Sequence, residues 1–144
     1  MRRLSSLGRL SLVVLPVFLL VGCSETGRVS PARPSVVRIS ERDFRIVVTP
    51  KRIPAGEAEL VVRNHGPDVH ELIIVRSRRS RLPIRLDELT VDEEAVNEVG
   101  AVEGLPPNGV RRLLLHLAPG RYEVFCNMAG HFMAGMSGTL VVER

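Results

Sequence analysis

Three side chains near the carboxyl terminus combine sulfur and nitrogen donors at equal spacing. Cys126, His131 and Met136 follow one another at intervals of five residues. Thiolate and thioether sulfurs are soft ligands that favour copper, especially in its reduced state, whereas hard cations prefer oxygen. Zinc sites seldom use methionine. This segment therefore predicts a copper site.

A fourth ligand has to come from another part of the chain, and the sequence offers His70 and His65. Both lie in the turn-rich segment 64–72. Strand alternation places His70 on the same face as Leu72 and Ile74, whereas His65 directly follows the end of the preceding strand. We therefore favour His70 as the fourth ligand, with His65 as the alternative.

The cysteine count gives Cys126 a special position. The chain has two cysteines, and the other one, Cys23, lies at the end of the amino-terminal leader. If Cys23 carries lipid, Cys126 has no disulfide partner in a compartment that usually oxidises thiols, which favours metal binding. The alternative is an inert cysteine buried as a small apolar residue.

Residues 1–22 have the layout of a secretory signal peptide. Basic residues up to Arg9 precede an apolar run over residues 10–21, which is short for a membrane span. The run ends in LVGC, which resembles the lipobox of bacterial lipoproteins, where the cysteine is acylated after cleavage in front of it. We expect lipidation at Cys23, with an ordinary cleavable signal or membrane anchor as the alternative. The pair Arg2-Arg3 is a feature of the twin-arginine export route, but one such pair in a basic leader does not decide the route.

The rest of the chain divides into a tether and one domain. Residues 23–35 are polar and rich in small residues and proline, which is typical of a flexible tether. Residues 36–144 have the length of a single domain. Without the three arginines of the leader, 17 basic residues face 16 acidic ones, and aromatic residues make up 3% of the chain. We therefore expect no nucleic-acid binding, which needs basic surfaces or base-stacking platforms.

Short segments rich in valine, isoleucine and leucine, separated by glycine, proline and asparagine, predict an all-β, two-sheet sandwich. The expected strands span residues 36–39, 44–48, 59–64, 70–75, 110–117, 121–126 and 139–143.

Residues 76–109 interrupt this strand pattern. They begin with a basic run over residues 76–81 and contain Thr90-Val91-Asp92-Glu93, which resembles a capping box for a short helix through about residue 98. We interpret this excursion as a solvated connection between two strands, with partner docking as the alternative.

Strand alternation also positions the candidate ligands. Cys126 shares the inward face of its strand with Tyr122 and Val124. His70 begins its strand and Cys126 ends its own, so an antiparallel pair brings both to the same end of the sandwich. His116 alternates with apolar neighbours and is expected on the outer face.

The tail YEVFCNMAGHFMAGMSGTLVV and the loop NHGPDVHEL resemble the cupredoxin, or blue-copper, family, and the Cys/His/Met spacing is similar to that of its auracyanin-like members. The resemblance covers roughly residues 36–144 and implies a Greek-key sandwich with one type 1 copper ion. It implies an equatorial thiolate from Cys126, equatorial imidazoles from His70 and His131, and an axial thioether from Met136. Many members carry asparagine after the first histidine, where it ties the two ligand loops together, but this chain has Glu71.

The resemblance further implies transfer of single electrons between redox protein partners through transient contacts. We expect a monomer that is held on the periplasmic or extracellular face of a membrane by its lipid. His131 is expected to reach the surface through an apolar patch formed by Phe132, Met133, Ala134 and Pro67. Four protein ligands leave no open coordination position, so we expect no enzymatic activity.

Two other functions stay open at this point. The same soft ligands would serve copper delivery or storage at the cell surface. A metal-free adhesion or scaffold sandwich is the third hypothesis. Met128 and Met133 are expected to be apolar filler or surface residues rather than ligands.

Overall fold

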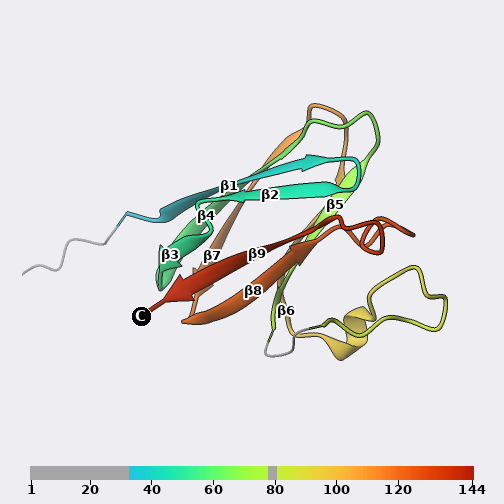
Figure 1. Cartoon of the computed structure of the whole chain (residues 1–144). Helices are drawn as coiled ribbons and strands as arrows, with labels where there is room; N and C mark the ends of the chain where they lie inside the picture. The colour runs from blue at the N-terminus through green and yellow to red at the C-terminus, as the bar shows by residue number, and fades with distance from the viewer. Residues whose placement is uncertain (1–32, 78–80) are drawn as a thin grey trace, which may run out of the picture. The chain divides into compact units, whose positions relative to one another are not determined.

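A computed structural model describes residues 33–77 and 81–144 of the chain. The chain divides into residues 1–30 and 31–144, and the described residues belong to the second unit. The expected signal peptide, Cys23, most of the tether and part of the basic run at 76–81 lie outside the described residues. Figure 1 shows the described part as a set of strands.

The described residues form nine strands and one short 3₁₀ helix. In chain order these are β1 (Ser35–Arg42), β2 (Arg45–Thr49), β3 (Arg52–Pro54), β4 (Gly56–Asn64), β5 (His70–Arg76), the helix (Glu93–Ala95), β6 (Glu98–Leu105), β7 (Val110–Leu117), β8 (Gly120–Phe125) and β9 (Ser137–Glu143).

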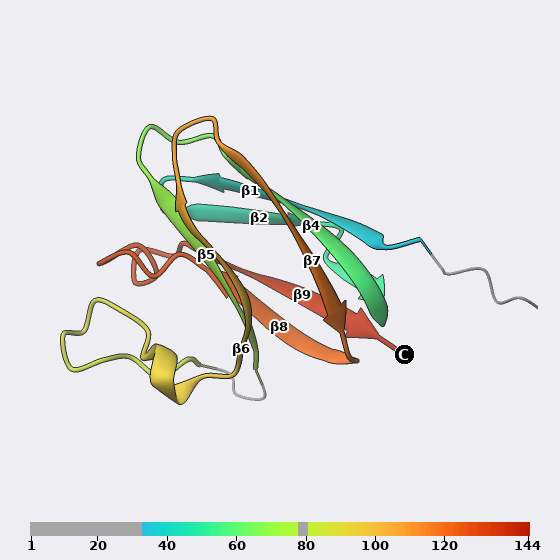
Figure 2. The same ribbon diagram turned by 180° about the vertical axis from the view of Figure 1, so that it is seen from behind.

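The strands form two mixed sheets, which the two opposite views in Figures 1 and 2 show as two layers. One sheet has the order β2-β1-β4-β7 and the other has the order β3-β9-β8-β5-β6. β1 runs parallel to β4 and β3 runs parallel to β9, whereas the other paired strands are antiparallel. The prediction of an all-β, two-sheet sandwich is confirmed.

The core lies between the two sheets and follows the alternation of the strands. Val37 and Ile39 on β1 face Leu72 and Ile74 on β5 across one apolar cluster, and all four are almost completely buried. Burial of such a side chain contributes about 1.5–3 kcal/mol relative to exposure. The period-two pattern of the sequence thus positions the inward face, on which the candidate ligands also lie.

Two strands were not predicted. β3 is three residues long, and β6 contains Gly100 and Gly104, which weaken the strand signal. A Cβ at Gly100 would lie 3.0 Å from the Leu113 side chain, so glycine allows β6 to pack closely there. β6 completes the sheet by pairing with β5, a tertiary contact that its own sequence does not indicate.

The helix prediction for residues 90–98 is wrong in extent. Only Glu93–Ala95 are helical, and the Asp92 side chain caps this turn by accepting a hydrogen bond from the Glu94 N–H at 3.3 Å. Val96 is already extended, and Glu98 begins β6. Pairing with β5 therefore overrides the weak local preference for helix.

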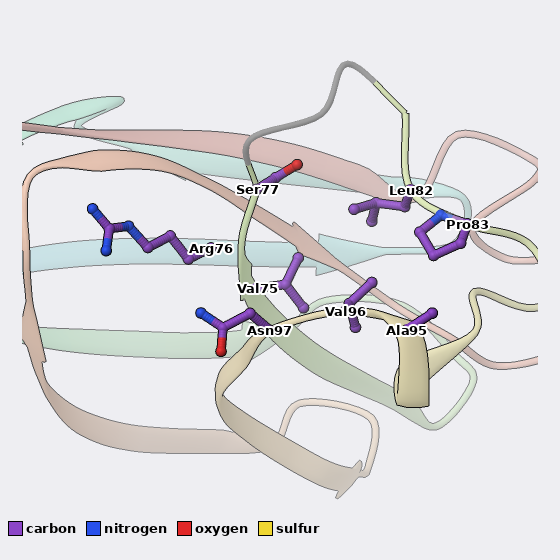
Figure 3. A pocket seen from close by; sticks show the side chains of 8 residues that line it. All are labelled: Val75, Arg76, Ser77, Leu82, Pro83, Ala95, Val96 and Asn97. Carbon is purple, nitrogen blue, oxygen red and sulfur yellow. The ribbon is translucent and has the colours of Figure 1, made fainter.

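The excursion between β5 and β6 also forms a second apolar cluster, so its interpretation as a solvated connection is wrong for part of its length. Val91 is fully buried together with Ile73, Val75 and Phe125 from the outward face of β5 and β8. β5 is consequently buried on both faces. A hollow at the far end of β5 lies between that strand and the excursion (Figure 3) and is lined by Val75, Arg76, Ser77, Leu82, Pro83, Ala95, Val96 and Asn97.

The described residues include no helix with the length and apolar character needed to cross a membrane.

Candidate metal centre

His70 and Cys126 lie at the same end of the sandwich because their strands are antiparallel neighbours. His70 is the first residue of β5, Cys126 directly follows β8, and Ile73 pairs with Phe125 in the register between them. Both residues are fully buried. The strand pairing alone thus brings a thiol and an imidazole from distant parts of the sequence together.

The loop after Cys126 returns the chain to the same place. The Cys126 N–H donates to the Met136 carbonyl at 3.1 Å, and the Met136 N–H donates to the His131 carbonyl at 3.0 Å. Gly130 and Gly135 have φ angles of 81° and 99°, a backbone region that glycine adopts without strain. The two glycines therefore allow a loop compact enough to keep all three candidate ligands at its base.

The donor atoms of His70, Cys126 and His131 all lie within 4.8 Å of one another. The Cys126 Sγ is 3.5 Å from the His131 Nδ1, and the centroids of the two imidazole rings are 5.3 Å apart. Met136 is fully buried, and His131 is half-buried. Within residues 33–77 and 81–144, no other group of three or more histidine, cysteine or acidic side chains meets at such distances.

The His70 ring is oriented by a carboxylate. Its Nε2 lies 3.1 Å from the Asp43 Oδ1, an arrangement in which the Nε2–H donates to the carboxylate. The Nδ1 is buried and has no hydrogen-bond partner among the described residues. A buried polar atom without a partner costs about 1–3 kcal/mol, and a metal ion would satisfy it. The residues present thus fit a bound metal.

Close packing holds this contact in place. A Cβ at Gly66 would lie 2.6 Å from the Asp43 Oδ1 and 3.0 Å from the His70 Nε2, so a side chain here would displace one of them. Asn64 closes the same loop, because its amide donates to the Asp68 carbonyl at 2.7 Å and its Oδ1 accepts from the Gly66 N–H at 2.8 Å.

Opposing influences act on the Cys126 thiol. Burial raises its pKa, and the nearby Glu71 and Glu41 carboxyls raise it further. The backbone N–H groups of Glu71 and Met128 donate to the sulfur and lower the pKa. Such donors stabilise a thiolate, which is the form that binds metal. The site therefore needs a positive charge to hold the thiolate in this buried place.

Glu71, which directly follows His70, links the two candidate ligand loops. Its carboxylate accepts a hydrogen bond from the backbone N–H of Asn127, the residue after Cys126. Burial and then the charge of Glu93 raise the pKa of Glu71. Glu71 therefore connects the loops and places an ionisable group beside the site.

Glu41 is a second carboxyl near the site. It is fully buried on β1, and neither of its carboxyl oxygens has a hydrogen-bond partner among the described residues. Burial, followed by the charge of Glu71, raises its pKa from 4.5 to about 8. Glu41 therefore keeps its proton to a higher pH than an ordinary carboxyl. Sequence alternation places Glu41 inward, but nothing in the sequence singles it out.

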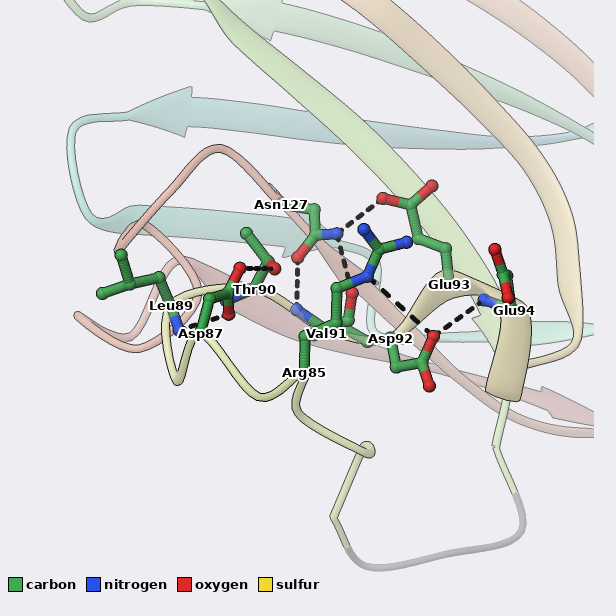
Figure 4. A network of polar contacts seen from close by, with 9 residues as sticks. All are labelled: Arg85, Asp87, Leu89, Thr90, Val91, Asp92, Glu93, Glu94 and Asn127. Carbon is green, nitrogen blue, oxygen red and sulfur yellow. Dashed lines mark hydrogen bonds and ion pairs between the residues drawn. The ribbon is translucent and has the colours of Figure 1, made fainter.

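The excursion holds the loop that follows Cys126 through the Asn127 side chain (Figure 4). The Asn127 Oδ1 accepts from the Val91 N–H at 2.6 Å, and its Nδ2 donates to the Val91 carbonyl at 3.1 Å and to the Glu93 carboxylate at 2.6 Å. In addition, the Gly130 N–H donates to the Leu89 carbonyl at 3.1 Å. Residues 89–93 thus restrain the chain directly after Cys126, a role that the sequence did not reveal.

The surface around His131 includes a ring outside the expected apolar patch, of which Met133, Ala134 and Pro67 are exposed and Phe132 is half-buried. Phe44, in the turn between β1 and β2, places its ring 5.4 Å from the His131 ring and is 54% exposed. Met133 is also 54% exposed. Phe132 turns toward Phe125 instead, with ring centroids 5.4 Å apart. Phe44 was missed because a turn residue 87 positions before His131 carries no sign of this contact.

The remaining candidates lie outside the cluster. His65 is exposed and takes no part in the group of close donor atoms, although its backbone N–H donates to the Glu41 carbonyl at 2.7 Å. His116 is exposed on the outer face, as expected, with its Nδ1 2.9 Å from Glu57. Met128 is 37% exposed, in agreement with a surface position.

Comparison with solved structures gives consistent neighbours, whereas the chain matches no protein-family model and no curated protein. It is similar to dithionite-reduced auracyanin from Roseiflexus castenholzii, with a TM-score of 0.57 and 19% identity over 78% of this chain and 99% of that one. It is also similar to auracyanin A, a "blue" copper protein from Chloroflexus aurantiacus, with a TM-score of 0.57 and 18% identity over 77% of this chain and 100% of that one. For reduced rusticyanin the TM-score is 0.54, with 20% identity over 82% of this chain and 89% of that one.

These likenesses show that the chain has the cupredoxin fold, in agreement with the resemblance of its two loops. The cluster of His70, Cys126 and His131 lies at one end of that fold, and the soft sulfur and imidazole donors fit one copper ion.

Proposed function

We propose that this chain is an exported, lipid-anchored protein that holds one type 1 copper ion and carries single electrons between redox partners. The observation that carries the proposal is the closed set of soft donors, in which His70, Cys126 and His131 meet within 4.8 Å beside the buried Met136. A bound copper ion would supply one-electron redox chemistry.

In this proposal His70, Cys126, His131 and Met136 would hold the copper ion. The protein contributes rigidity, because strand pairing, the Asp43 contact and the Asn127 contacts fix the ligands before the metal binds. A site that is held in this way changes little between two oxidation states, which favours rapid electron exchange.

The proposed route for electrons runs through His131. It is the one half-buried side chain of the donor cluster, and Phe44 and Met133 form exposed apolar surface beside it. A small contact surface of this kind suits short-lived docking, which is typical of redox encounters. We infer a carrier rather than an enzyme, because four protein ligands leave no position open for substrate.

The proposed location follows from the leader. The basic start, the apolar run over residues 10–21 and the LVGC sequence support cleavage before Cys23 and acylation of its sulfur. Lipid anchoring would hold the domain on the periplasmic or extracellular face of a membrane through the tether at residues 23–35.

Copper delivery is the second candidate, and the exposed thioethers of Met128 and Met133 favour it, since surface sulfurs could pass reduced copper to an acceptor. The two functions differ in how firmly the copper is held. An electron carrier keeps its ion through oxidation and reduction, whereas a donor releases it in the reduced state.

Repeated redox cycling tests the proposal. Copper-loaded full-length protein would be cycled between ascorbate and hexacyanoferrate in the presence of a copper(I) chelator, with the metal content measured after each cycle. We expect full retention and a visible band that returns at each oxidation. Loss of copper to the chelator in the first reduced phase would contradict the carrier function and support delivery. A Met128→Leu, Met133→Leu variant is the control, because only delivery depends on those thioethers.

A further inference from the structure

The outer face of the sheet β2-β1-β4-β7 carries arginine in three successive cross-strand rows at the metal end. In the first row Arg38 lies between Thr49 and Val61, with Arg112 next to Val61. In the second, Ser40 lies between Val47 and Arg63. In the third, Arg42 pairs directly with Arg45. All five arginines are exposed.

Few acidic groups compensate these charges. Arg112 forms an ion pair with Glu59 at 2.6 Å, but Arg38, Arg42, Arg45 and Arg63 form none with any of the described residues. Like charges directly opposite each other on adjacent strands destabilise a sheet, and Arg42 and Arg45 are such a pair. The fold gains nothing from this arrangement, which points to an anionic partner.

The shape of the surface agrees with its charge. Two open hollows lie on this face, and both include arginine, Ser40 and His65. Valine side chains lie between the arginines in the hollows. Arginine presents a planar fork that matches a carboxylate in two hydrogen bonds. Guanidinium groups around small apolar hollows fit the carboxylates of an acidic protein.

The arginines continue directly into the surface beside His131. Arg42 and Arg45 flank Asp43 and Phe44, and the Phe44 ring packs against the His131 ring. The Asp43 carboxylate is engaged by His70. A partner bound to these arginines would therefore also contact the surface at Phe44 and His131, where the proposed electron route reaches solvent.

We propose that this surface, the arginine face, is the docking site for an acidic redox protein. It consists of Arg38, Arg42, Arg45, Arg63, Arg112 and His65. The proposal rests on the electron-carrier function and names the chemistry of the partner, which has carboxylates around its own redox centre. Complementary charges of this kind raise association rates, and salt weakens the effect because charges more than about 10 Å apart are screened at 0.1 M.

A membrane with anionic lipids fits the face less well. The far half of the same sheet face carries Glu57 and Glu59, so a lipid surface lying along the sheet would meet acidic as well as basic groups. The four arginines without ion pairs are confined to the half next to the metal centre. That distribution favours a partner that covers one end of the face.

The test compares two variants with the same change in charge. In the first, Arg38, Arg42, Arg45 and Arg63 are replaced by glutamine. In the control, Arg33, Lys51, Arg52 and Arg144 are replaced by glutamine, because these exposed cations lie at the far end of the strands. The probe is a purified acidic haem protein with carboxylates around its haem edge. Its affinity is measured with metal-free full-length protein, and its rate of electron exchange is measured separately with copper-loaded protein.

We expect about a tenfold loss of affinity and of exchange rate at low salt for the first variant, little change for the control, and a weaker salt dependence only in the first. An equal loss of affinity in both variants, or no loss in either, would overturn the proposal that the arginine face is a docking site. The proposal would also be overturned if the wild-type protein bound phosphatidylglycerol vesicles through the same four arginines and did not bind the haem protein. Failure of the proposed function would be recognised separately, as absence of electron exchange despite normal arginine-dependent binding.

Discussion

Asp43 and Phe44, adjacent in one turn, each contact a different histidine of the site. The Asp43 carboxylate lies 3.1 Å from the His70 Nε2, and the Phe44 ring lies 5.4 Å from the His131 ring. The turn between β1 and β2 therefore orients one imidazole from inside and covers the other from outside. A hydrogen-bonded carboxylate fixes the tautomer of a ligating imidazole and makes it a stronger donor.

Asp43→Asn is expected to raise the reduction potential of the copper-loaded protein. The amide keeps the size of the side chain and can still accept from the imidazole, but the negative charge that favours the oxidised ion is lost. Spectroelectrochemical titration measures the shift, with Asp68→Asn as a control, because Asp68 is exposed in a neighbouring loop. Equal potentials in wild type and Asp43→Asn would show that the carboxylate does not act on the metal.

Asn127→Ala is expected to lower the free energy of unfolding by about 2–3 kcal/mol, because it leaves the buried Val91 N–H and carbonyl without partners. Urea unfolding of the metal-free protein measures this change. Asn97→Ala provides the control, since that side chain is exposed. If both variants lose the same small amount, the excursion does not restrain the loop through Asn127.

Glu41→Gln is expected to make the metal-free protein more stable than wild type, by an amount that increases with pH. The pKa of Glu41 is about 8 in the folded state against an ordinary value of 4.5. A carboxyl with a raised pKa contributes its full stability below pH 4.5, and that contribution is lost progressively up to pH 8. Glutamine stays neutral, so it should gain about 3 kcal/mol relative to glutamate at pH 7.

The check on Glu41 is denaturant unfolding of both proteins across that pH range. The two curves should nearly coincide at the acidic end and separate as pH rises. Parallel curves would mean that Glu41 ionises in the folded state as it does in the unfolded chain.

The sequence was sufficient where the information is local. The intervals between Cys126, His131 and Met136 lie within one loop, and alternation along β5 and β8 places His70 and Cys126 inward at the same end. These features depend on neighbouring residues and on the period of a strand, so the all-β sandwich and the grouping of three donors could be predicted.

Contacts between distant segments could not be predicted in the same way. Asp43 meets His70 only because the two sheets pack together, and Val91 meets Asn127 only because the excursion folds back over β5 and β8. β6 was missed for a similar reason, since its glycines weaken the strand signal and its pairing with β5 defines it. Single-sequence patterns do not contain these pairings.

The most direct test of the central claim is the visible absorption spectrum after cupric ion is added to the purified metal-free protein. A bond between copper and the Cys126 thiolate predicts an intense charge-transfer band at one equivalent of metal. The band should persist in His65→Ala, because His65 lies outside the donor cluster, and vanish in Cys126→Ser. A colourless wild-type protein, or a band that survives Cys126→Ser, would contradict the account.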